Sequence, residues 1–166
     1  MRHLLVLVMA VFLSNIVDAQ VRINLNFNID RQPIWGPTGY DHVEYYYLPD
    51  VEAYYYVPQQ RFYYYEGGRW ISGSSLPSRY GGYDLYNSYK VVVNEPTPYR
   101  HHTTYREKYS SYKGRHDQQA IRDSRDAKYF VNDHHPEHNT WVKQQKHDNG
   151  NGKGGEKGHG NKSGRK

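Results

Sequence analysis

The sequence contains no cysteine among its 166 residues. Without cysteine the protein has no disulfide bond, no thiolate nucleophile and no cysteine-ligated zinc or iron–sulfur site. Long hydrophobic runs are also scarce, because the longest, residues 4–13, is about half as long as a membrane-spanning helix. The chain is too short for a barrel-sized enzyme. A folded core must therefore be held together by packing alone.

The N-terminal segment has the pattern of an export signal. Arg2 and His3 form a short basic start, residues 4–13 are apolar, and a more polar stretch ends at Ala19. This order predicts a signal peptide over residues 1–19, with cleavage between Ala19 and Gln20. We expect the mature protein to be exported to the periplasm, the cell surface or the exterior, without a membrane-spanning segment.

Tyrosine dominates the region that follows. Apolar side chains are few in residues 20–112, yet this region holds all but one of the 19 tyrosines. A tyrosine ring buries on the order of 150–250 Å², so we expect the tyrosines to form the core and its rim. Because tyrosine also favours strands, we predict a mainly β domain here: a small antiparallel sheet or open barrel of short, tyrosine-rich strands.

Several patterns place the strands. Residues 21–29 alternate apolar and polar side chains without a break, which predicts a strand with one buried face. Tyrosine triplets recur at residues 45–47, 54–56 and 63–65, each followed by a proline or glycine turn signal, so we predict a meander of hairpins. The apolar run in residues 90–94 predicts a further short strand.

The glycine pair after the third triplet allows a prediction of register. A two-residue turn at Gly67 and Gly68, with both residues at positive φ, places Glu66 opposite Arg69. The same turn places Tyr65 opposite Trp70. We therefore expect a charge pair next to the turn and an aromatic pair one step further along the hairpin.

The C-terminal third loses the tyrosine pattern. Residues 113–142 form a polar extension with scattered apolar side chains, in which residues 117–128 are compatible with a short helix. Residues 129–131 are apolar enough to dock the extension as an added edge strand. Residues 143–166 are rich in glycine and lysine and have no large apolar side chain, so we expect a disordered tail.

One series of tyrosines is a candidate binding surface. Tyr80, Tyr83, Tyr86 and Tyr89 recur every third residue. Aromatic rings stack on sugar rings, on nucleobases and on the side chains of arginine and lysine. The alternative is that these rings simply cover the sheet.

A histidine-rich passage is the candidate metal site. His134, His135 and His138 lie beside Asp133 and Glu137, and this combination offers ligands for Zn²⁺, Ni²⁺ or Cu²⁺. Pro136 opposes a continuous helix through the passage, and the alternative is a solvated polar loop. No serine lies in a GxSxG turn, and no acidic residue stands out as half of a carboxylate pair. We therefore expect neither an enzyme nor a cofactor.

Five strings together resemble a family of exported, tyrosine-rich bacterial proteins for which no activity is established. The strings are YYYLPD (45–50), GGRW (67–70), LPSRYGGYDLYNSYKVVVN (76–94), RDSRDAKYF (122–130) and HPEHNTW (135–141). This resemblance supports export and a β-rich body, and it implies no catalytic residue.

The distribution of charge narrows the choice of partners. Basic and acidic side chains balance over residues 20–142, so the net charge of +5 resides in the tail. A tail of this kind gives salt-sensitive contacts of low specificity, which disfavours specific nucleic-acid binding. We predict a non-enzymatic, envelope-associated structural or interaction protein that contacts anionic envelope polymers or polysaccharide. The alternatives are a carbohydrate-binding module that uses exposed tyrosines and a histidine-mediated metal-binding protein; the oligomeric state stays open.

Overall fold

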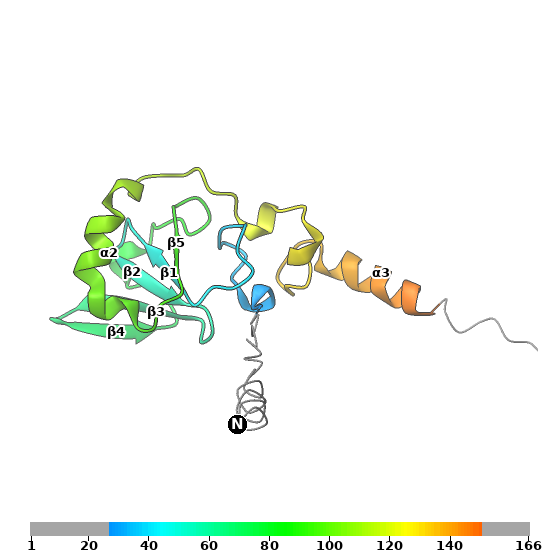
Figure 1. Ribbon diagram of the computed structural model, residues 1–166, viewed down its shortest axis with the longest axis horizontal. Helices are drawn as coiled ribbons and strands as arrows, with labels where there is room; N and C mark the ends of the chain where they lie inside the picture. Colours follow the sequence, from blue (N-terminus) through cyan, green and yellow to red (C-terminus); the bar gives the residue numbers. More distant parts are fainter. Residues whose placement is uncertain (1–26, 151–166) are drawn as a thin grey trace, which may run out of the picture.

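A computed structural model describes residues 27–150 and contains one five-stranded antiparallel sheet (Figure 1). The strands are β1 (Tyr45–Leu48), β2 (Ala53–Tyr56), β3 (Arg61–Glu66), β4 (Arg69–Gly73) and β5 (Val91–Val93). Their order in the sheet is β4-β3-β2-β1-β5, so the first four form a meander and β5 returns to pair with β1. The sheet does not close into a barrel. The predicted open antiparallel sheet of tyrosine-rich strands is therefore confirmed.

The hairpin between β3 and β4 has the predicted register. Glu66 lies opposite Arg69, and Tyr65 lies opposite Trp70. Gly67 and Gly68 have φ values of 58° and 79°, the left-handed conformation that both positions of such a turn require. The predicted strand in residues 90–94 is also present, as β5.

The first two tyrosine triplets are almost wholly buried because the sheet is covered on both faces, whereas the third is only partly buried. Alternate residues of a strand point to opposite faces, so Tyr46 and Tyr55 pair on one face while Tyr45 and Tyr56 pair on the other. The first face, which we call the mixed face, also carries aliphatic side chains and packs against Trp35, Leu76, Tyr80, Tyr83 and Leu85. The second, the tyrosine face, is built almost wholly from aromatic rings; its strand residues are Tyr45, Tyr47, Tyr54, Tyr56, Tyr63, Trp70, Val91 and Val93.

One of the two α-helices in the described residues covers the sheet. Helix α2 (His102–Lys108) covers the tyrosine face through Tyr105, and helix α3 (His138–Gly150) extends away from the sheet (Figure 1). Short 3-10 helices connect the larger elements; they are η1 (Ile29–Arg31), η2 (Ser78–Tyr80), η3 (Pro98–His101), η4 (Ser110–Tyr112), η5 (Ile121–Asp123) and η6 (Ala127–Tyr129). Within residues 27–150, no helix is both long enough and apolar enough to cross a membrane.

The strand predicted at residues 21–29 is wrong where it can be compared. Residues 21–26 lie outside the described part of the chain, and Ile29 begins η1. The side chain of Asn28 bonds both backbone groups of Val43: its amide nitrogen donates to the carbonyl at 2.7 Å, and its oxygen accepts from the N–H at 2.9 Å. A side-chain amide thus takes the place of a strand partner.

The C-terminal extension docks, but neither as the predicted helix nor as an edge strand. Residues 117–128 contain only η5 and the start of η6, because their backbone instead bonds residues 34–38. The N–H of Ile121 donates to Gly36, and Ala120 forms an isolated bridge with Pro37. Tyr129 ends η6 rather than starting a strand; it is 1% exposed, and its hydroxyl accepts a bond from the N–H of Gly39 at 2.6 Å.

The predicted tail is helical at its start. Residues 143–150 continue α3, and residues 151–166 lie outside the described part of the chain. Helix α3 begins two residues after Pro136, where the restriction that proline places on the helix no longer applies.

Asn132 is the main polar anchor of the extension. It is 1% exposed, and its amide nitrogen donates to the carbonyls of Gln32 at 2.6 Å and Ile29 at 3.2 Å. We predict that Asn132→Ala lowers the free energy of unfolding by about 1–3 kcal/mol, because buried carbonyls lose their donor. Urea denaturation measures this change. Asp133→Ala, at a side chain that is 72% exposed, is the matched control; an equal loss in both variants would contradict the anchoring role.

Candidate functional site

An open cleft lies at the end of the sheet where the β1–β2 turn and the β3–β4 hairpin meet η3 and α2. Its volume is about 590 Å³, within the range of about 300–1,000 Å³ typical of ligand sites. The side chains that line it come from both sides: Val51, Glu52, Tyr65, Trp70, Tyr80, Tyr99, Arg100, His101, His102, Thr103, Thr104 and Arg106. The cleft therefore combines aromatic rings with cationic and hydroxyl groups.

Trp70 is the centre of the aromatic wall. Its ring lies 5.5 Å from that of Tyr65, 5.6 Å from that of Tyr99 and 5.1 Å from that of His102, measured between centroids. Tyr99 also stacks on Tyr63 at 4.8 Å, with only 9° between the planes. These contacts hold the indole in place before any ligand arrives. Tyr65 is 54% exposed, the most accessible ring of the wall.

The cationic wall comes from one continuous segment. Residues 99–106 run through η3 into α2, and this path brings Arg100 and Arg106 to the same cleft. Within residues 27–150, neither guanidinium forms an ion pair. The cleft therefore presents two guanidinium groups without a direct carboxylate partner in the described chain, although the charge of Arg106 helps to lower the pKa of Glu52.

Glu52 supplies the single carboxylate of the cleft, and that carboxylate is already engaged. Lys113 donates to it at 2.6 Å, and the Nε2 atom of His102 lies 3.6 Å away. Burial on its own would raise the pKa of Glu52, but the bond and the charge of Lys113 outweigh it and hold the pKa below its usual value. Glu52 has a φ of 52°, which is uncommon for a residue other than glycine.

His102 links the cleft to the core. Its Nδ1 atom lies 3.2 Å from the hydroxyl of Tyr54, a residue of the buried tyrosine face. Burial lowers the pKa of His102 below its usual value, although the carboxylate of Glu52 opposes this shift. Protonation of this imidazole is therefore coupled to the stability of the fold.

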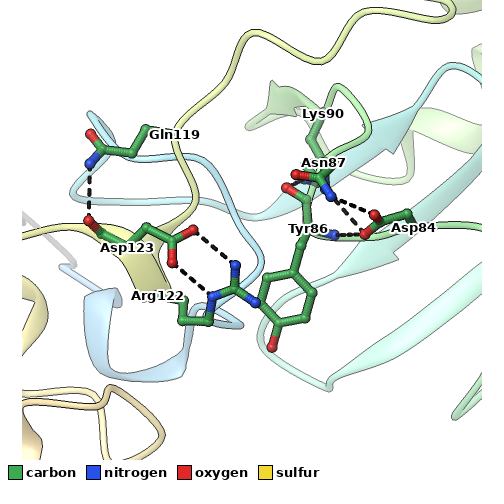
Figure 2. A network of polar contacts seen from close by, with 7 residues as sticks. All are labelled: Asp84, Tyr86, Asn87, Lys90, Gln119, Arg122 and Asp123. Carbon is green, nitrogen blue, oxygen red and sulfur yellow. Dashed lines mark hydrogen bonds and ion pairs between the residues drawn. The ribbon is translucent and has the colours of Figure 1, made fainter.

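The four tyrosines predicted as a binding surface do not form one platform. Tyr80 lines the cleft, whereas Tyr83 packs on the mixed face of the sheet. Tyr86 is covered by the guanidinium of Arg122, 4.1 Å from its ring centroid (Figure 2). Tyr89 stacks on Tyr112 at 4.6 Å. Tyr83, Tyr86 and Tyr89 thus pack against other parts of the protein, while Tyr80 both packs on the mixed face and lines the cleft.

Figure 2 shows how the loop around Tyr86 is fixed. The carboxylate of Asp84 accepts bonds from the backbone N–H groups of Tyr86 at 2.9 Å and Asn87 at 3.2 Å. Lys90, which is 1% exposed, donates to the carbonyl of Tyr86 at 3.2 Å, and burial lowers its pKa to about 8. This network holds the Tyr86 ring against the extension and away from the cleft.

The predicted histidine ligands do not converge on a metal site. His134 is exposed, while His135 is buried and its Nδ1 atom accepts a bond from the N–H of Glu137. His138 donates from Nδ1 to the carbonyl of Phe130 at 2.8 Å. Among the residues that the structure describes, no three His, Cys, Asp or Glu side chains are grouped to hold a metal ion.

Sequence reasoning missed the cationic wall. Arg100 and Arg106 are six positions apart and match no motif, and their charges are lost in a body whose overall charge is balanced. The sequence signal is local: within residues 99–106, one arginine, two histidines and two threonines lie between two tyrosines, and a second arginine follows. For Trp70 the sequence predicted the pairing with Tyr65 but not a place in the cleft.

Comparison with known proteins adds no relative, because no family model, curated protein or solved structure matches the chain significantly. The resemblance to exported tyrosine-rich proteins stays a prediction. The geometry of the cleft is therefore the basis for assigning a function.

The free energy of unfolding should fall as the pH drops below about 6.5, the ordinary pKa of histidine. Because the folded state depresses the pKa of His102, the unfolded chain binds the proton first, and acid favours unfolding. We expect His102→Gln to flatten the pH dependence between pH 7 and pH 5, measured by urea denaturation. The control His101→Gln, at an exposed neighbour, should keep the wild-type slope; a slope unchanged by His102→Gln would contradict the coupling.

Proposed function

We propose that this protein is a non-enzymatic, exported binding protein that holds a carbohydrate of the cell envelope in the cleft around Trp70. The observation that carries the proposal is the gathering of four aromatic residues with arginine and threonine side chains in one open site; the four are Tyr65, Trp70, Tyr80 and Tyr99. A sugar ring has an apolar C–H face that packs on an aromatic ring, and its hydroxyls pair with polar groups at the rim.

The acid–base groups of the cleft favour binding over hydrolysis. Glycoside hydrolysis commonly uses two carboxyl groups that flank the scissile bond. Glu52 is the single carboxylate among the lining residues, and Lys113 and His102 already engage it. A site of this composition is suited to retaining a sugar chain.

The N- and C-terminal segments support a role at the cell envelope. Residues 1–19 have the pattern of a signal peptide, and the net charge of +5 resides in residues 143–166. We propose that the positive tail adds salt-sensitive attraction to anionic envelope polymers, while the cleft makes the specific contact.

Tyr65 provides a direct test of the cleft. We expect Tyr65→Ala to weaken glycan binding by about tenfold, because an exposed ring that contacts the ligand is removed without opening the core. Binding is measured by the change in tryptophan emission, with ligands first found on an array of envelope glycans. Tyr40→Ala removes a ring that is 40% exposed but does not line the cleft, so it should bind normally. The proposal is wrong if the array is silent and tryptophan emission is unchanged.

The contribution of the tail is tested separately. The mature protein and a version that ends at Gly150, the last residue of α3, are mixed with isolated envelope fractions. We expect the shortened chain to be retained less at low salt, and the difference to shrink as salt is added. Equal retention of both chains at low salt would rule out a role for the tail.

A further inference from the structure

We propose that the cleft selects acidic sugar chains, with Arg100 and Arg106 binding the anionic group while the rings around Trp70 bind the sugar face. This inference rests on the proposed function and goes beyond it by naming the chemical class of the carbohydrate. It also moves the anionic contact from the predicted tail to a defined site in the folded part of the chain.

The side chains that line the cleft have a net positive charge. Arg100 and Arg106 line it without ion pairs within residues 27–150, whereas the carboxylate of Glu52 is engaged by Lys113 and His102. The unneutralised charge is therefore positive. A guanidinium presents its N–H donors in a planar fork that matches a carboxylate or a similar oxyanion.

Aromatic rings lie beside these positive charges in the same cleft. A small inorganic anion needs only the guanidinium groups, and a neutral sugar needs only the rings and hydroxyls. The cleft places Tyr65 and Trp70 beside Arg100 and Arg106, within one volume of about 590 Å³. A sugar that bears a carboxylate uses both walls at once.

A second hollow indicates how a chain of sugars continues. Its volume is about 520 Å³, and it shares Glu52 and Arg106 with the cleft. Glu107 and Lys113 also line it, so its charges are mixed. The anionic unit is therefore assigned to the first cleft, and Arg106 lies where a longer chain would pass from one hollow to the other.

A matched pair of ligands tests this selectivity. The full mature protein is titrated, by calorimetry and tryptophan emission, with a short oligogalacturonate and with its methyl ester, which keeps the sugar rings but lacks the charge. We expect the acid to bind about tenfold more tightly than the ester, and its affinity to fall as salt is added. Arg106→Gln and Arg100→Gln should each weaken binding of the acid by about three- to tenfold and weaken binding of the ester by clearly less, so that the preference for the acid shrinks.

The controls separate this inference from the proposed function. Arg125→Gln removes an exposed charge that does not line the cleft and should have no effect; a loss equal to that of Arg106→Gln would mean diffuse attraction and overturn the proposed selectivity. Equal affinity for acid and ester, with Tyr65→Ala still harmful, would overturn selectivity and leave carbohydrate binding intact. Failure of both oligomers and of the glycan array would overturn both. Tighter binding of a thymidine oligonucleotide than of the acid would assign the cleft to single-stranded nucleic acid and overturn the inference.

Discussion

The fold depends on burying tyrosine on both faces of a small sheet. A buried tyrosine contributes a large apolar area, but its hydroxyl must find a partner or remain costly to bury. Two hydroxyls bond residues outside their own element: Tyr46 of β1 donates to Gln32 at 3.1 Å, and Tyr105 of α2 donates to Glu95 at 2.6 Å. The same side chains that fill the core therefore also hold the surrounding loops. Burial accordingly raises the pKa of Tyr45 to about 12 and shifts that of Tyr46 upward as well.

Tyrosine rings also help to hold the polar extension, because arginine side chains of the extension lie over them. It has few apolar side chains, and it docks by covering tyrosine rings with arginine. Arg122 lies over Tyr86 at 4.1 Å, and Arg115 lies over Tyr89 at 4.8 Å. These contacts add to the backbone bonds with residues 34–38 and to the buried side chains of Tyr129 and Asn132, which together pack a neutral, polar segment on the body. The cleft differs in this respect, because neither Arg100 nor Arg106 lies over an aromatic ring of residues 27–150.

Local rules account for the parts of the fold that the sequence predicted. The tyrosine triplets with their turn signals and the paired glycines at residues 67–68 act over a few residues, so they are enough to specify the hairpin and its register. Where an element depends on contacts distant in the sequence, the prediction failed. The segment at residues 117–128 does not form a continuous helix because its backbone bonds residues 34–38, and helix α2 packs on the sheet because Tyr105 fills the tyrosine face. The cleft was missed for the same reason, since its walls come from residues 51–80 and 99–106 and meet only in the fold.

Protonation of His102 acts in opposite directions on the stability of the fold and on the attraction of the cleft for an anionic ligand. Neutral His102 fits the core, because burial beside Tyr54 disfavours its charged form. A protonated His102 would instead add a third positive charge next to Arg100 and Arg106, which favours an anionic ligand. By linkage, an acidic ligand in the cleft raises the proton affinity of His102, and the ligand in turn stabilises the folded state that holds it. Under the proposed function, acid weakens the empty fold while it strengthens binding of the acidic ligand, and a bound ligand would offset the cost of placing an ionisable ring between a buried tyrosine and an open cleft.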